Sequence, residues 1–140
     1  MASSKRRATL KSAPVAYIPH VGWLRHQPGE ELITLLRQGY FEAAEQAFYR
    51  LYLRPGDTFI DCGAHIGLYS VIAGQVTDGK ARIIAIEASR ETAEHLEFNL
   101  RHNGVANAEV IRAALWMAPG SLRRANMMKN APQKRHIQHQ

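Results

Sequence analysis

Short apolar runs with the character of buried strands alternate with runs of helical periodicity, and this alternation constrains the fold more than any other feature of the chain. The first strand-like run covers residues 58–62 and is followed by apolar residues at helical spacing over about 68–76. A second covers 82–87 and precedes a helix over about 90–103, and a third runs from about 109 to 115. Because strands and helices that alternate in this way are joined by right-handed crossovers, the sequence predicts an α/β fold with a parallel sheet of about three strands and flanking helices.

Charge is distributed unevenly along the 140 residues. The chain has 18 Lys and Arg residues against 12 Asp and Glu residues, and all of the acids lie within residues 30–118. Residues 1–29 and 119–140 are basic and free of acid, so we expect a flexible N-terminal tail and a disordered C-terminal tail around one partial domain at 30–118. A nucleic-acid-binding domain carries its basic residues on a folded face, so no nucleic-acid partner is expected.

Order is expected to begin near Glu30. From there, apolar residues at helical spacing predict two short helices or one kinked helix, with a stop at Gly39 and with Phe41, Phe48 and Leu51 in the core.

Composition excludes several classes of protein. The single cysteine, Cys62, rules out a disulfide framework within the chain, and we expect it to be a small buried residue of the first strand. No uninterrupted apolar run reaches the roughly 18 residues that a membrane span needs, and no secretory signal precedes the folded part, so we expect a cytoplasmic protein. His136 and His139 have no third ligand nearby, and we therefore predict no metal site.

The carboxyl ends of the predicted strands are where a sheet of this kind binds its ligand. At the end of the first strand, residues 61–67 form an Asp-x-Gly-x-x-x-Gly pattern that contains Asp61, Gly63 and Gly67. A dinucleotide fingerprint is absent because His65 stands where its second glycine would be, and a carboxylate at the strand end would repel a diphosphate. The pattern favours a cationic ligand, and S-adenosylmethionine offers a sulfonium and an amino group there, with its carboxylate near the N–H groups of the following helix.

The next two strand ends add further candidates. Glu87 ends the second strand, where a carboxylate accepts hydrogen bonds from both hydroxyls of a ribose. Ala113, at the end of the third strand, is a weaker candidate for the adenine edge. Tyr69 and Ser70 are candidates for contact with the carboxylate of the donor, with packing in the core as the alternative for Tyr69. His65 is expected to line the pocket or cap the helix rather than to act as a base.

The stretch Leu-Arg-Pro-Gly-Asp-Thr-Phe-Ile-Asp-Cys-Gly-Ala-His-Ile-Gly-Leu-Tyr-Ser over 53–70, with the later Ala-Ile-Glu-Ala-Ser over 85–89, resembles FkbM-type class I S-adenosylmethionine-dependent methyltransferases. Further matches are at Leu96 to Asn99, at Asn103 and at Ala-Ala-Leu over 113–115, so that the resemblance covers about half of the chain.

The resemblance implies a Rossmann-like sheet with S-adenosylmethionine as cofactor. The loop from Asp61 to Gly67, including Ala64, would hold the methionine part, Glu87 the ribose, and Ala88 would lie beside the adenine. It also implies O-methylation of a small-molecule or glycan hydroxyl.

The chain departs from the family pattern at three places. His65 replaces a frequent asparagine, Glu87-Ala88 replaces the usual Glu-Pro, and nothing after Leu115 resembles the later Lys-x-Asp-x-Glu-Gly type motif of the substrate side. We therefore expect a truncated or split enzyme that retains the cofactor-binding half. The alternative is a non-catalytic fragment that associates with another chain through an open sheet edge.

Overall fold

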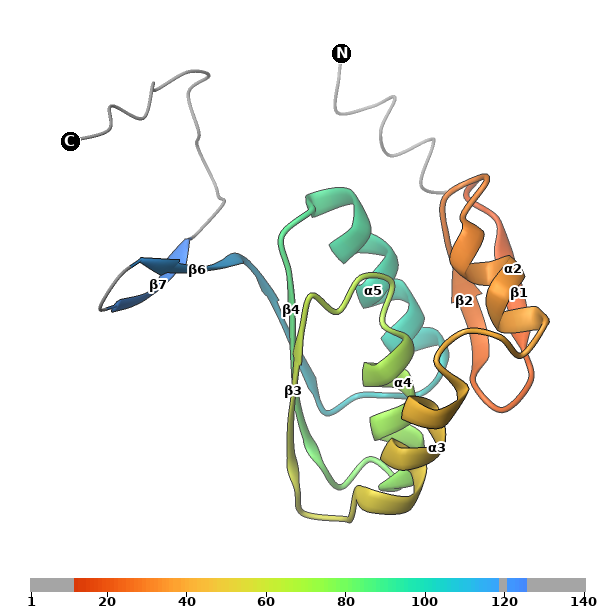
Figure 1. The fold of residues 1–140 in the computed structure, drawn as a ribbon, viewed down its shortest axis with the longest axis horizontal. Coiled ribbons are helices and arrows are strands. Elements are labelled where there is room, and N and C mark those ends of the chain that lie inside the picture. The colour runs from red at the N-terminus through yellow and green to blue at the C-terminus, as the bar shows by residue number, and fades with distance from the viewer. Residues whose placement is uncertain (1–11, 119–120, 126–140) are drawn as a thin grey trace.

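A parallel sheet of three strands lies at the centre of the computed structural model, which describes residues 12–118 and 121–125 (Figure 1). Its strand order is β3 (Thr58–Cys62), β4 (Arg82–Glu87) and β5 (Ala108–Arg112). Two helices connect these strands, α4 (Leu68–Val76) and α5 (Arg90–His102). The predicted Rossmann-like α/β fold, with a parallel sheet of about three strands and flanking helices, is confirmed.

One face of this sheet carries the core. Helices α3 (Ala43–Tyr52), α4 and α5 lie on the same side of the strands (Figure 1), and Ile83 and Ala85 of β4 point into that side with no exposed surface. The opposite face has no helix over it in the part of the chain that the structure describes, and Ile60 is 56% exposed there. The strands therefore have apolar side chains on both faces, but the described helices cover only one face.

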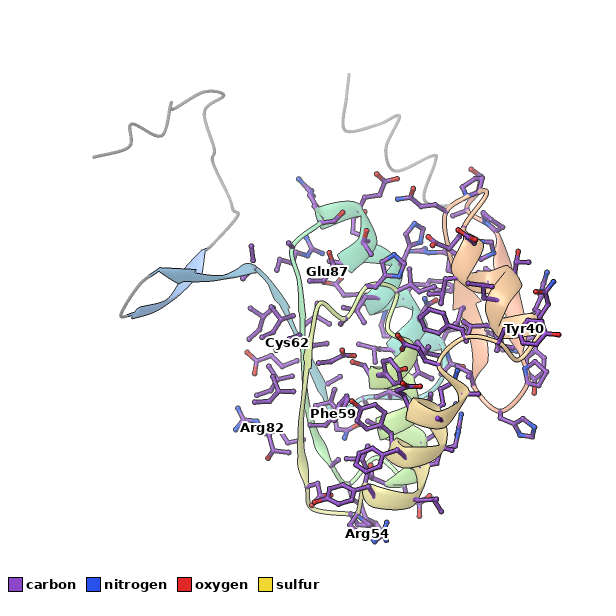
Figure 2. All side chains as sticks on the ribbon, viewed as in Figure 1. Tyr40, Arg54, Phe59, Cys62, Arg82 and Glu87 are labelled. Atoms are coloured by element: carbon purple, nitrogen blue, oxygen red, sulfur yellow. The ribbon has the colours of Figure 1, made fainter. Side chains whose placement is uncertain are left out.

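Cys62 lies on this open face. Figure 2 shows Cys62 and Arg82 pointing away from the helices, whereas Phe59 points toward them. The expectation that Cys62 is buried is wrong, because side chains alternate along a strand and the buried neighbour is Asp61.

The segment before Glu30 is ordered over most of its length. Residues 12–29 contain an antiparallel hairpin of β1 (Val15–Ile18) and β2 (Gly22–Arg25), whose Ala16, Ile18 and Leu24 are buried in the main core. The expectation of a flexible tail is wrong for these residues, and residues 1–11 lie outside the described part. Burial alternates along Val15–Ile18 although all four residues are apolar, and Pro14 and Pro19 flank the strand without interrupting it.

Two short helices follow the hairpin, as predicted. They are α2 (Glu31–Arg37) and α3, with Gly39 in the connection at a φ of 73°. Phe48 and Leu51 of α3 are exposed, so their expected place in the core is wrong. Helix α3 instead contacts the rest of the domain through Tyr49, which packs against Phe59.

After β5 the chain forms a second, separate hairpin. Strand β6 (Ala114–Ala118) pairs antiparallel with β7 (Ser121–Ala125), so the expected third strand over 109–115 divides at Ala113. The expected disordered tail contains β7, while residues 126–140 lie outside the described part. Among the described helices, none has the length and apolarity to cross a membrane.

The one-sided core predicts a difference between two neighbouring isoleucines. Ile83→Ala should lower the free energy of unfolding by about 2–5 kcal/mol, because Ile83 is fully buried and its truncation leaves a cavity. The same truncation of Ile60, on the open face of the adjacent strand, should cost less than about 1 kcal/mol. Urea denaturation of both variants measures the difference, and equal losses would mean that the open face is covered in solution.

Candidate ligand site

The carboxyl ends of the three parallel strands meet at one edge of the sheet. Strand β3 is in register with β4 such that Cys62 lies opposite Ile86, and Glu87 lies opposite Arg112 of β5. Beyond β3 the chain folds over the end of β4, where the N–H groups of Gly63 and Ala64 both donate to the Ile86 carbonyl oxygen at 2.9 Å. Asp61 and Glu87 therefore lie at the same edge of the sheet, as the pattern of strand ends predicts.

Asp61 is a buried carboxylate on the helix-covered face of β3. Its exposed fraction is 9%, and its Oδ2 accepts a hydrogen bond of 2.6 Å from Ser70 Oγ at the start of α4. Burial raises the pKa of Asp61, and the negative charge of Glu87 raises it further, while the hydrogen bonds from Ser70 act in the opposite direction. A carboxylate in this setting is stabilised by any cation that reaches it.

Glu87 holds the ends of two strands together through backbone N–H groups. Its Oε2 accepts from the His65 N–H at 2.9 Å, and its Oε1 accepts from the Ser89 N–H at 2.8 Å (the side chain is labelled in Figure 2). Ser89 also caps α5, with its Oγ accepting from the Thr92 N–H at 3.3 Å. Each carboxylate oxygen has a further lone pair, so Glu87 can accept from two more donors.

The loop between Asp61 and α4 requires glycine at Gly67. Gly67 has a φ of 94°, and a Cβ there would lie 2.6 Å from Leu96 Cδ1 of α5. The preceding His65 has a φ of 51°, and its Nε2 lies 3.9 Å from Glu30 Oε2. The imidazole thus pairs with the start of α2, in keeping with a pocket-lining residue.

A cavity of about 440 Å³ opens beside this loop, between β3 and the helices α2 and α3. Of the predicted site residues it brings together the following five: Asp61, Gly63, Ala64, His65 and Tyr69. Its other walls are mostly apolar and aromatic, with one further acid, Glu42. This combination of an apolar wall and a few carboxylates suits a ligand that has both a cationic and an apolar part.

Tyr69 lines the cavity and packs at the same time. Its hydroxyl donates to Glu42 Oε2, and its ring lies 5.0 Å from that of Tyr49 in an edge-on arrangement. Burial raises the pKa of Tyr69, and the hydrogen bond to Glu42 adds to the shift. The phenol is therefore neutral and acts as a hydrogen-bond donor at physiological pH.

The remaining predicted residues lie outside the cavity wall. Glu87, Gly67 and Ala88 are not part of the lining, and Glu87 bonds the N–H of the lining residue His65. Ala113 is buried, and its N–H donates to the Glu87 carbonyl at 3.1 Å. Within the described ranges no group of three His, Cys, Asp or Glu side chains is arranged to hold a metal ion.

Sequence reasoning placed Ser70 at the carboxylate of the donor and gave Asn99 no role beyond its place in the family pattern. Ser70 contacts Asp61, and Asn99 of α5 donates from Nδ2 to the Ile66 carbonyl oxygen at 2.8 Å. Both residues are fully buried on apolar helix faces. A polar residue within an apolar stripe was the available signal, because a buried polar group needs a partner.

Comparisons with known proteins find similarity only among solved structures. No protein-family model matches the sequence, and no curated protein matches it. The chain is similar to the precorrin-6y C5,15-methyltransferase of Geobacter metallireducens GS-15, with 21% identity, a TM-score of 0.46, and coverage of 52% of this chain and 39% of that chain. It is also similar to the geranyl diphosphate C-methyltransferase of Streptomyces coelicolor A3(2), in complex with Mg²⁺, geranyl diphosphate and S-adenosyl-L-homocysteine, with 19% identity, a TM-score of 0.48, and coverage of 64% and 34%.

A third similar structure is coclaurine N-methyltransferase bound to N-methylheliamine and S-adenosylhomocysteine, with 25% identity, a TM-score of 0.48, and coverage of 56% of this chain and 22% of that chain. This chain thus spans less than half of the length of each of the three proteins. TM-scores below 0.5 do not establish a shared function, so the chemistry of the site has to carry any assignment.

The buried carboxylate predicts a pH-dependent effect of Asp61→Asn on stability. Because the folded-state pKa of Asp61 is raised, its protonation stabilises the fold, and this contribution is complete below the ordinary aspartate pKa and is lost as the pH rises through the raised value. At pH 7 the ionised wild-type side chain is therefore a cost, and Asp61→Asn should raise the melting temperature by about 2–6 °C, the shift that ~1 kcal/mol produces in a chain of this size.

Thermal unfolding between pH 3 and pH 8 measures this effect. The gain should shrink as the pH falls and wild-type Asp61 takes up its proton. The matched control is Glu109→Gln, which removes one charge from an exposed position of β5 and should change the melting temperature little at any pH. A lower melting temperature of Asp61→Asn at pH 7 would show that the ionised carboxylate stabilises the free protein.

Proposed function

We propose that this chain is the cofactor-binding part of an FkbM-type class I methyltransferase and binds S-adenosylmethionine at the edge formed by Asp61 and Glu87. One observation carries the proposal. Two carboxylates lie at the ends of neighbouring parallel strands, and the glycine-containing loop between them is tied to the second carboxylate through the His65 N–H at 2.9 Å. This arrangement offers negative charge and hydrogen-bond acceptors to an adenosyl sulfonium.

Asp61 is proposed to face the cationic end of the ligand. Its carboxylate is largely removed from water, which raises its pKa and makes its ionised form costly without a counter-charge. A sulfonium or an ammonium group at the cavity wall supplies that counter-charge. The loop residues Gly63, Ala64, His65 and Gly67 would surround the methionine part, with Tyr69 beside them.

Glu87 is proposed to accept both ribose hydroxyls. The two N–H groups that it already binds fix the orientation of its carboxylate, and one lone pair remains on each oxygen. Ala88 follows the end of β4 and Ala113 follows the end of β5, and both are proposed to lie near the adenine. The buried side chain of Ala113 leaves the backbone as the contact there.

A bound S-adenosylmethionine supplies an electrophilic methyl group, and the resemblance of the sequence to FkbM-type enzymes points to a hydroxyl oxygen of a small molecule or glycan as the acceptor. The described residues of this chain bind and orient the donor, so their contribution to the rate is positioning. Because the chain spans only part of the proteins it resembles in structure, the acceptor and the complete reaction are proposals for the whole enzyme.

Isothermal titration with S-adenosylhomocysteine tests the assignment of Glu87. Glu87→Gln keeps the size of the side chain but replaces one acceptor oxygen with an amide NH2 group. This NH2 group then faces a backbone N–H and cannot accept its hydrogen bond. We expect the affinity to fall by about tenfold or more, because hydrogen bonds to a charged acceptor contribute about 1.5–3 kcal/mol each. Glu109→Gln, on the exposed part of β5, should leave the affinity unchanged, and an equal affinity of Glu87→Gln and the wild type would contradict the ribose assignment.

A second candidate function, association with a second copy of the chain, is favoured by the position of β3. This strand is at the edge of the sheet, with Ile60 56% exposed on the open face. An edge strand offers unpaired backbone groups to another chain.

Sedimentation velocity over a range of concentrations tests this association. If the chain self-associates through β3, the wild type forms dimers and Ile60→Lys abolishes them, because a charged side chain on an edge strand disfavours pairing with a second chain. A monomer at all concentrations that binds S-adenosylhomocysteine would support the first function alone.

A further inference from the structure

Asn99 of α5 joins the N-terminal hairpin to the loop of the proposed site. Its side chain has no exposed surface, and its amide makes three hydrogen bonds to backbone groups. Oδ1 accepts from the Arg25 N–H at 2.6 Å, while Nδ2 donates to the Arg25 carbonyl at 3.0 Å and to the Ile66 carbonyl at 2.8 Å. Both protons of the amide group are therefore used, and one backbone group of the loop depends on it.

Asn103, the residue that ends α5 as its C-cap, makes a similar contact to the hairpin but does not bond the loop. Its Oδ1 accepts from the Trp23 N–H at 3.0 Å, and its Nδ2 donates to the Trp23 carbonyl at 2.7 Å. The second proton of Nδ2 goes to the Asn99 carbonyl of its own helix, also at 2.7 Å. Each asparagine thus pairs with both the N–H and the carbonyl of one β2 residue, as a residue of a neighbouring strand would. Only Asn99 also bonds the loop.

The Ile66 carbonyl that Asn99 binds lies in the middle of the loop, next to the residues that contact Glu87 and begin α4. Ile66 is 1% exposed, and it stands between His65, whose N–H binds Glu87, and Gly67, where α4 begins. A buried carbonyl that loses its donor costs free energy, and the backbone moves to find another partner. Any such movement changes the direction of the His65 N–H and of the first turn of α4.

The hairpin in turn fixes Asn99. Arg25 holds both ends of the amide, so the amide cannot rotate without breaking two hydrogen bonds. The Arg25 side chain reinforces this contact, because its guanidinium donates to the Glu94 carbonyl at 2.7 Å and to His95 Nδ1 at 3.1 Å, both on α5. The hairpin is therefore attached to α5 over the same turn that contacts the loop.

We propose that Asn99 is a positioning residue for the ligand site, that it sets the conformation of the loop at residues 63–67, and that hairpin β1–β2 holds it in place. The inference rests on the proposed function for the identity of the ligand. The segment that composition marks as a basic tail then takes part in ligand binding at a distance, without touching the ligand.

Titration of two ligands separates positioning from general stability. S-adenosylhomocysteine contains the amino-acid part that the loop would hold, whereas 5′-methylthioadenosine lacks it. Asn99→Asp keeps the acceptor for the Arg25 N–H but removes both donors. We expect it to weaken the binding of S-adenosylhomocysteine by about tenfold, the loss that corresponds to one or two hydrogen bonds. The binding of 5′-methylthioadenosine should weaken by a clearly smaller factor, because the Ser89 N–H still orients Glu87 toward the ribose.

Asn103→Asp is the matched control, because it loses two donors and gains one charge in the same way but does not touch the loop. It should change neither affinity by more than about twofold. Asn99→Ala removes the two donors and also the acceptor of the Arg25 N–H, without adding a charge, and its effect on the two affinities should match that of Asn99→Asp. All titrations are made at a temperature where thermal unfolding shows every variant to be folded.

Amide hydrogen exchange gives a readout that needs no ligand. The N–H groups of His65 and Gly67, which bond Glu87 and the Ala64 carbonyl, should exchange about tenfold faster in both Asn99 variants and at the wild-type rate in Asn103→Asp. Equal effects of the Asn99 and Asn103 variants, or equal loss of both ligands in Asn99→Asp, would overturn the positioning role. If the wild type binds neither ligand, the proposed function is wrong, and the exchange rates alone decide the role of Asn99.

Discussion

The hydrogen bonds of the Glu87 carboxylate are the interaction on which the arrangement of this site depends. One oxygen binds the loop that follows β3, and the other binds the N–H of Ser89, which caps α5. A single side chain at the end of the central strand thereby fixes both flanking connections. Because backbone N–H groups are obligatory donors, a neutral side chain without two acceptor oxygens leaves one of them unpaired at the edge of the sheet.

The site also contains a residue whose ionised form lowers the stability of the free protein, and the fold alone does not explain its presence. Asp61 is buried with one hydroxyl partner, and burial outweighs that partner in raising its pKa. A polar neutral side chain would satisfy Ser70 without the desolvation of a charge. Groups that destabilise the free protein in this way are typical of binding sites, where a ligand supplies the missing counter-charge.

Local patterns were sufficient for the sheet but not for what surrounds it. The strands and helices around Asp61 and Glu87 could be predicted because each is encoded by a short apolar period, and parallel pairing then places the two carboxylates at one edge. The hairpin could not, since its partners Asn99 and Asn103 lie 74 and 80 residues further along the chain. The exposure of Cys62 could not be predicted either. The alternation of side chains along a strand shows that the two faces differ, but it does not show which face the helices cover.

Three side chains that position the loop and the strand ends lie on the helix-covered side of the sheet. Ser70 belongs to α4, Asn99 to α5, and Glu87 receives its second N–H from the cap of α5. The open face of β3 and β4 contributes none of these contacts among the described residues. The loop is thus held from one layer of helices and from the hairpin attached to it.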